Sequence, residues 1–142
     1  MPGAEISSIV KVPPKAIYDI VLDFERYGEF LPDVKDSVIE KKTAKVVQAT
    51  FEISVIKKIR YTLDFHPTPH KKITWSFVKG DVFKNNHGFW QFEEVKKGET
   101  KVTYHLEIEL GFLVPSLITN KLIGTSLPDM MKRFKQRAES LA

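Results

Sequence analysis

Hydrophobic and polar residues alternate along most of the chain between residues 33 and 110, which is the pattern of β-strands that bury one face. The clearest example is Thr100–Leu110, where an apolar side chain stands at every second position from Val102 onward. Prolines and glycines interrupt the alternation, so Gly80–Gly88 is predicted to be a polar loop and Lys97-Gly98 a hairpin turn. We predict strands at Ala4–Val12, Asp33–Lys42, Lys45–Lys57, Lys58–His66, Lys72–Lys79, Phe89–Val95 and Thr100–Leu110.

Apolar residues recur at steps of three and four on either side of this region, and that spacing predicts helices. The first helix is predicted at Lys15–Phe24, directly after a proline pair that suits a helix start because no amide donor is needed there. A short second helix is predicted within Glu25–Pro32, and a long one over Pro115–Ala142. Because Pro128 has no amide hydrogen, the long helix either kinks there or restarts with Ser126 as its cap.

These elements predict an α+β fold: a single domain over residues 1–142, in which a curved, seven-stranded antiparallel sheet wraps around the long C-terminal helix. One helix cannot cover the concave face of such a sheet. The remaining space is therefore filled by bulky side chains or left as a cavity that binds a ligand, and both alternatives are open. The candidate ligand-contacting residues are Phe51, Tyr61, Trp75, Phe77, Phe83, Trp90, Phe92, Tyr104, Met130, Met131 and Phe134.

The composition limits the chemistry available to the chain. With 142 residues, 42% of them hydrophobic and 28% charged, it can bury a core and stay in solution. It contains no cysteine, which excludes disulfides, thiolate catalysis and cysteine-based zinc sites. The chain has no apolar leader and no apolar run long enough to span a bilayer. We therefore expect a cytoplasmic protein, with a peripheral position at a membrane as the alternative.

A run of residues after the first predicted helix carries a recognisable motif. Asp23 is followed by Tyr27, and then by Phe30, Leu31 and Pro32. This spacing resembles the motif of the START-like superfamily, which includes polyketide cyclases and dehydrases, although a glycine stands where proline is usual. Within that superfamily the chain is most similar to the coenzyme Q-binding START-like proteins and to the bacterial ribosome-association toxins.

Two further segments extend the resemblance over nearly the whole chain. The stretch from Gly80 to Phe92 ends in the family's Gly-x-Trp-x-Phe pattern, with the polar run Asn85–His87 in place of an apolar step. The segment Phe134–Ala138 matches near the C-terminus. The resemblance implies a helix-grip fold, two short helices after the first strand, and an apolar cavity between sheet and long helix.

The same resemblance implies that this cavity binds a lipid-like or polycyclic molecule, such as the quinone coenzyme Q (ubiquinone), and does not catalyse a reaction. Tyr27, Phe30 and Leu31 are then expected at the cavity entrance. There they either cap the core or gate the opening. The oligomeric state is left open.

Two other functions are consistent with the sequence. The net charge of +4 and the pI near 9.2 permit docking on a ribosomal subunit, as the family branch implies. The basic residues that would make this contact are Lys57, Lys58, Arg60, Lys132, Arg133, Lys135 and Arg137. The second function is that of a cyclase or dehydrase, in which Tyr61, Tyr104 and Arg60 would supply the polar groups.

No motif in the chain predicts a metal, a cofactor or DNA as a partner. The four histidines do not form a helical His-x-x-x-His pair with a nearby acid. Glu107 and Glu109 alternate on one predicted strand, as solvated residues do, and glycine-rich phosphate loops and nucleophile elbows are absent. The predicted partner is therefore a hydrophobic small molecule, with the ribosome or a membrane surface as the macromolecular alternatives.

Overall fold

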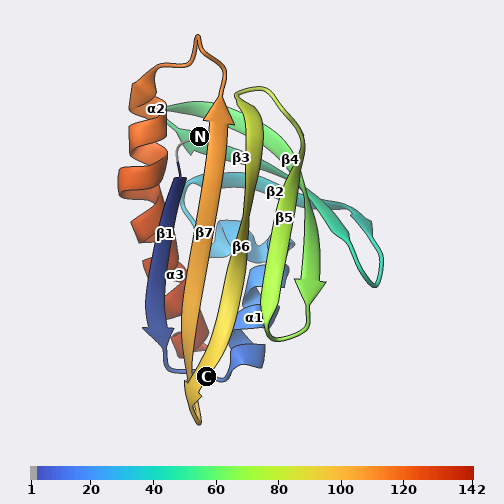
Figure 1. The fold of residues 1–142 in the computed structure, drawn as a ribbon, viewed down its shortest axis with the longest axis vertical. Helices are drawn as coiled ribbons and strands as arrows, with labels where there is room; N and C mark the ends of the chain where they lie inside the picture. Colours follow the sequence, from blue (N-terminus) through green and yellow to red (C-terminus); the bar gives the residue numbers. More distant parts are fainter. Residues whose placement is uncertain (1–2) are drawn as a thin grey trace.

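The computed structural model describes residues 3–142 and contains a seven-stranded antiparallel sheet that curves around a C-terminal helix (Figure 1). The strand order is β1-β7-β6-β5-β4-β3-β2. Consecutive strands from β2 to β7 are therefore neighbours, and β1 closes the row by pairing with β7. The strands are β1 (Gly3–Val10), β2 (Val34–Lys42), β3 (Val47–Val55), β4 (Lys57–Thr68), β5 (Lys72–Gly80), β6 (Phe83–Lys96) and β7 (Glu99–Leu110).

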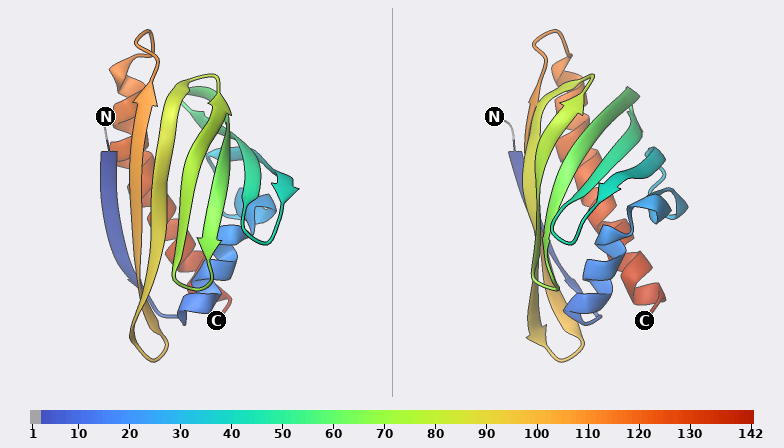
Figure 2. Two further views of the ribbon diagram at one scale, coloured as in Figure 1. Left: turned by 45° about the vertical axis from the view of Figure 1, so that its right-hand side comes forward. Right: turned by 90° about the vertical axis from the view of Figure 1, so that its right-hand side faces the viewer.

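The helices lie on the concave side of the sheet, as the two views in Figure 2 show. Between β1 and β2 come α1 (Pro14–Leu22) and the short 3₁₀ helix η1 (Phe24–Glu29). The C-terminal helix consists of α2 (Ser116–Lys121), the π-helical turn η2 (Leu122–Ser126) and α3 (Leu127–Ser140). The predicted α+β helix-grip fold is thus confirmed, while residues 1 and 2 of the predicted domain lie outside the described residues.

The long helix passes Pro128 without a break. The predicted restart with Ser126 as a cap is wrong: Ser126 has helical backbone angles (φ −67°, ψ −39°) and makes no capping hydrogen bond. Instead, the amide of Leu127 donates to the carbonyl oxygen of Leu122, five residues back. A proline removes one helical hydrogen bond and its ring crowds the carbonyl four residues earlier. Widening the preceding turn to a π-helix relieves that conflict, and such turns are frequent at functional sites.

The predicted loop at Gly80–Gly88 is wrong, because β5 continues to Gly80 and β6 already begins at Phe83. A shift in register between Phe83 and Asn85 places an extra residue in β6. This bulge breaks the simple alternation, so Phe83 and Asn86 are both buried although they stand three positions apart. The strand predicted at Lys58–His66 also continues further than expected, because β4 extends to Thr68 and Pro67 lies within it opposite Ile73.

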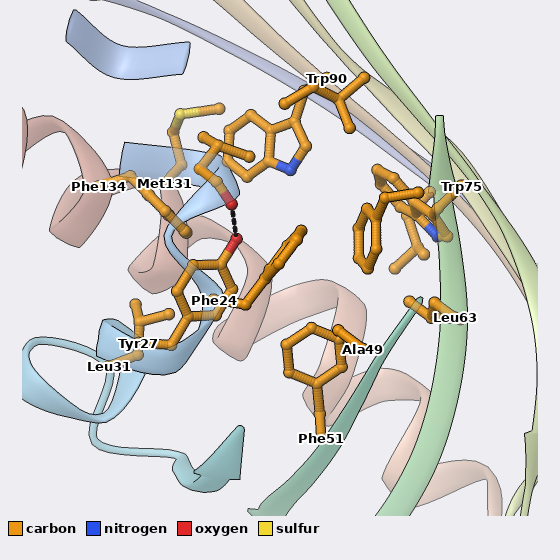
Figure 3. Packing of buried hydrophobic residues seen from close by; sticks show 14 of the residues in the cluster. Phe24, Tyr27, Leu31, Ala49, Phe51, Leu63, Trp75, Trp90, Met131 and Phe134 are labelled. Carbon is orange, nitrogen blue, oxygen red and sulfur yellow. Dashed lines mark hydrogen bonds between the residues drawn. The ribbon is translucent and has the colours of Figure 1, made fainter. Parts of the chain in front are cut away.

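The core lies between the concave face of the sheet and the helices (Figure 3). Phe24 and Phe134 are its largest fully buried side chains. The ring of Phe24 lies 4.4 Å from that of Phe65 and 5.8 Å from that of Phe51, centroid to centroid. The hydroxyl of Tyr27 donates to the carbonyl oxygen of Val21, so η1 is tied to α1 inside the core. This packing closes one end of the space under the sheet.

Candidate functional site

Between the sheet and the C-terminal helix a cavity remains, with a volume of about 160 Å³. One side is formed by inward-facing residues of β3 to β7, and the other by residues of η2 and α3. Tyr27 of η1, the loop that follows it and the first residue of β2 complete the lining. The lining residues are Tyr27, Leu31, Pro32, Asp33, Val34, Phe51, Ile53, Val55, Tyr61, Leu63, Phe65, Trp75, Phe83, Asn86, Trp90, Tyr104, Leu106, Ile108, Leu122, Ser126, Leu127, Asp129, Met130, Arg133 and Phe134.

Aromatic rings form a continuous wall on the sheet side of the cavity. The ring of Tyr104 lies between the two indoles, 5.2 Å from Trp75 and 4.7 Å from Trp90. Further along, the ring of Tyr61 lies 5.1 Å from Phe83 and 5.5 Å from Phe51. Rings at these separations hold one another in place, so the wall presents fixed apolar faces to the cavity.

A buried hydrogen bond fixes the tryptophan at the centre of this wall. The indole nitrogen of Trp75 donates to Oδ1 of Asn86 at 2.9 Å, and both residues are buried. A buried indole N–H needs a partner, and Asn86 supplies it from the neighbouring strand. The polar run that departs from the family pattern therefore contributes a structural partner for the aromatic wall.

The helix side of the cavity carries a hydroxyl that the protein leaves unpaired. Oγ of Ser126 is buried. Within residues 3–142 it is the only buried side-chain nitrogen or oxygen atom that has no hydrogen-bond partner. It stands in the π turn η2 and lines the cavity. A buried hydroxyl without a partner costs about 1–3 kcal/mol. A bound molecule with a hydrogen-bonding group would recover that energy.

Burial keeps the two cavity tyrosines in their neutral form. It raises the pKa of Tyr61 and of Tyr104 well above the ordinary value of 10.0, because a phenolate would lose its hydration inside the protein. The nearby Tyr61 adds to the increase for Tyr104. Both side chains therefore offer O–H groups to the cavity at every physiological pH.

We expect all four tyrosines to ionise above the ordinary pH in the folded protein, because burial also raises the pKa values of Tyr18 and Tyr27. A raised pKa in the folded state stabilises the fold below pH 10 and loses that contribution as the pH rises above it. Ultraviolet titration of the native protein should therefore show little tyrosinate until unfolding begins, with unfolding followed by circular dichroism. Normal titration near pH 10 with the fold intact would contradict the buried positions of these rings.

The structure places eight of the eleven candidate contact residues in the lining, and three outside it. The residues that line the cavity are Phe51, Tyr61, Trp75, Phe83, Trp90, Tyr104, Met130 and Phe134. Phe77 is half-buried further along β5, and Phe92 packs against Tyr18 of α1 with ring centroids 5.9 Å apart. Met131 is buried in the core beside the cavity. Alternation along a strand predicts the face of a residue but not its position along the cavity.

The predicted entrance residues divide in the same way. Tyr27 and Leu31 are buried and line the cavity. Phe30 lies outside it, with its ring 5.1 Å from that of Phe134 and 5.1 Å from the guanidinium carbon of Arg137. These contacts fit the capping alternative for Phe30, since it covers the core without facing the cavity.

Several lining residues had no counterpart in the predicted site. On the helix, Leu122 and Ser126 face the cavity, together with the ion pair of Asp129 and Arg133, whose Oδ2 and Nε atoms lie 2.7 Å apart. Both charged side chains are close to half exposed, which places them at the rim. The spacing of Asp129 and Arg133 by four residues on a helix was the available signal. Arg60 does not join the cavity tyrosines, because it is exposed and lies near Glu52.

The described residues contain neither a metal-binding cluster nor a membrane-spanning helix. No group of three or more histidine, aspartate or glutamate side chains within residues 3–142 is arranged to hold a metal ion. No helix in that range is long and apolar enough to cross a membrane. His105 bonds Glu5 and Glu107 at 3.2 and 3.1 Å on the outer face of the sheet, away from the cavity lining.

Comparisons with known proteins agree with this geometry. A START superfamily protein from Mycobacterium smegmatis superposes with a TM-score of 0.86 at 20% identity, covering 99% of both chains. The Zhui aromatase/cyclase from Streptomyces sp. R1128 superposes with a TM-score of 0.73 at 13% identity, covering 98% of this chain and 87% of that one. At these identities the likeness shows a common fold.

Sequence comparison adds the family. Ribosome association toxin RatA from Pseudomonas aeruginosa is 28% identical over 138 residues, which cover 95% of this chain and 94% of that protein. The family profile described as polyketide cyclase / dehydrase and lipid transport matches residues 10–135. The chain therefore belongs to the polyketide cyclase/dehydrase and lipid transport family, as its START-like motifs predict.

Proposed function

We propose that the protein binds a hydrophobic small molecule in the cavity between sheet and helix and does not transform it. The observation that carries this proposal is the cavity itself, an apolar space of about 160 Å³ that the surrounding side chains leave unfilled. In another protein, an apolar cavity of about 150 Å³ stays dry and takes up benzene. The space here is accordingly large enough for the ring of a ligand.

The polar groups in the cavity define the other property of this ligand. Tyr61 and Tyr104 offer neutral hydroxyl groups, and Ser126 offers a hydroxyl that lacks a partner. All three can donate to a carbonyl oxygen. A ring with carbonyl substituents matches this combination of flat aromatic walls and hydroxyl donors. A quinone is therefore the ligand class that we propose, with lipid-like molecules as its competitors.

The same residues do not form an evident catalytic group. The hydroxyls of Tyr61 and Tyr104 are poor bases and poor acids at neutral pH because their pKa values are raised. Three residues with charged side chains line the cavity: Arg133 and Asp129 neutralise one another at its rim, and Asp33 stands alone on the segment between η1 and β2, without a second carboxylate beside it in the lining. Binding without chemistry therefore accounts for the arrangement with fewer requirements than a cyclase reaction does.

The experiment that tests this function uses the protein as it is purified. We expect mass spectrometry of an organic extract to detect a hydrophobic molecule in stoichiometric amount. We also expect the emission of Trp75 and Trp90, which both line the cavity, to change when a soluble quinone is added. The proposal would be refuted if the purified protein contained no hydrophobic molecule and its tryptophan emission did not change on addition of quinones or fatty acids.

Docking on a ribosomal subunit is the second candidate, because a relative at 28% identity is named a ribosome association toxin. The structure reduces the basic surface that was predicted for this contact. Arg133 is paired with Asp129, and Arg137 is paired with Glu29 at 2.5 Å. Lys57, Lys58 and Lys132 remain exposed. We therefore place ribosome docking second to ligand binding.

A further inference from the structure

Three connections of the chain meet at one end of the sheet. They are the β3–β4 hairpin around Ile56, the β5–β6 connection at Asp81-Val82, and the loop from β7 into α2 at residues 111–115. Hydrogen bonds join them in sequence: the amide of Asp81 donates to the carbonyl of Arg60 and that of Gly111 donates to the carbonyl of Val82, both at 3.2 Å. In Figure 1 the β7–α2 loop extends furthest in this direction. We call this surface the loop end.

The loop end exposes apolar side chains that the fold does not use. Phe112 and Leu113 are adjacent at the tip of the β7–α2 loop and are 88% and 84% exposed. Leu117 on the first turn of α2 and Ile56 at the tip of the hairpin are 62% and 58% exposed. Such a concentration of bulky apolar groups is unusual on a free surface and marks a site of interaction.

Ile56 is an apolar residue at a backbone position that disfavours its side chain. Its φ angle is 69°, in the left-handed region that β-branched residues rarely adopt and that favours glycine or asparagine. An isoleucine there strains the backbone and buries little of its side chain within the protein. A contact outside the protein would account for its presence.

The charge of the loop end is strongly positive. The three connections with their flanking residues (55–58, 79–84 and 111–121) contain five lysines and one acidic residue, Asp81. Their charge of +4 equals the net charge of the whole chain. All five lysines, Lys57, Lys58, Lys79, Lys84 and Lys121, are exposed.

From these observations we infer that the loop end docks on an anionic lipid bilayer, with Phe112 and Leu113 inserted among the acyl chains and the lysines at the headgroups. Lys84 already lies 5.9 Å from the ring of Phe112, so a basic group and an apolar wedge stand side by side. Insertion of apolar side chains combined with attraction of lysines to anionic lipid is the basis of peripheral membrane binding. The inference does not depend on what the cavity holds.

Two other partners fit less well. A second copy of this chain would bring the same positive charge against itself across a two-fold contact, which is unfavourable. Ribosomal RNA would attract the lysines but offers no apolar phase for Leu113, Leu117 and Ile56. A bilayer accommodates both the charge and the apolar side chains.

The test measures co-sedimentation of the intact protein with vesicles of mixed phosphatidylglycerol and phosphatidylcholine, against vesicles of phosphatidylcholine alone. We expect binding to the anionic vesicles and much weaker binding to the neutral ones. The double variant Phe112→Ser with Leu113→Ser should reduce the affinity on the order of a hundredfold, because two apolar side chains no longer insert. Lys84→Gln should reduce it about fivefold, which is the contribution of one lysine near an anionic surface.

Matched controls come from the opposite end of the sheet. Val95→Ser and Lys97→Gln change an exposed apolar residue and an exposed lysine beside the β6–β7 turn, and neither should alter vesicle binding. Ile56→Gly should raise the melting temperature, because it relieves the left-handed strain, yet weaken vesicle binding. The two opposite effects separate a role in docking from a role in stability.

Insertion can be observed directly because the chain contains no cysteine. Leu113→Cys carrying an environment-sensitive fluorophore should shift its emission to the blue on anionic vesicles, whereas Val95→Cys should not. Absence of vesicle binding, or equal binding by the double serine variant, would overturn the inference. The inference would also be overturned if the protein did not bind vesicles and the double serine variant instead abolished self-association or sedimentation with ribosomal subunits.

Discussion

Met130→Trp is expected to lower the affinity for the cavity ligand about a hundredfold and leave the protein folded. Met130 is half-buried and lines the cavity from α3, so a larger side chain there can extend into the unfilled space. A drug-sized ligand gains about 0.3 kcal/mol per non-hydrogen atom, so displacing roughly ten atoms should lower the affinity about a hundredfold. Calorimetry with a soluble quinone measures this change without interference from the added tryptophan.

The adjacent methionine provides the matched control. Met131 is 3% exposed and packs in the core beside the cavity, where there is no room for a larger side chain. Met131→Trp should therefore destabilise the fold by about 1–3 kcal/mol or more, as overpacking does. If Met130→Trp unfolds the protein to the same extent, the space beside Met130 was already filled and the cavity interpretation fails.

Gly88→Ala is expected to give the largest loss of stability of any glycine-to-alanine substitution in the chain. A Cβ atom at position 88 would lie 1.9 Å from the carbonyl oxygen of His105 and 2.8 Å from Cζ2 of Trp75. The first contact is with the backbone of β7, which cannot move without disturbing the sheet. We expect the free energy of unfolding to fall by about 3 kcal/mol or more, measured by urea denaturation.

Gly124 offers the same substitution in an open place. A Cβ atom there meets nothing within 4 Å, and the residue lies in the helical turn η2. Gly124→Ala should leave stability unchanged or raise it by up to about 1 kcal/mol, because alanine favours a helix. Equal effects at positions 88 and 124 would show that β6 does not approach β7 and Trp75 as closely as described.

Most of the sheet could be predicted because each strand buries one face. In the predicted strand Thr100–Leu110 every inward position from Val102 onward is apolar, and β7 occupies nearly those residues in the structure. The first half of β6 was not predicted, and the structure gives the reason. Its bulge between Phe83 and Asn85 shifts the alternation, and the inward position of Asn86 is polar because it pairs with Trp75. That pairing is a tertiary contact, which local pattern does not contain.

The helix side of the cavity was only partly predictable for a similar reason. A stripe of apolar residues at steps of three and four assumes 3.6 residues per turn throughout. The π turn η2 inserts an extra residue, so the face that leads into α3 is rotated relative to that of α2. The spacing alone could not decide between Met130 and Met131, and it gave no reason to place Ser126 in the lining.

The position of β1 also affects how the chain folds as it is synthesised. β1 is synthesised before the other six strands of the sheet, yet it pairs with β7 alone, and the hydrogen bond between the hydroxyls of Ser7 and Thr103 joins residues 96 positions apart. The meander from β2 to β7 can assemble through neighbours, whereas β1 must wait until nearly the entire chain has emerged. Until then, the edge of β7 lacks its partner strand, and an unpaired edge can form backbone hydrogen bonds with another chain.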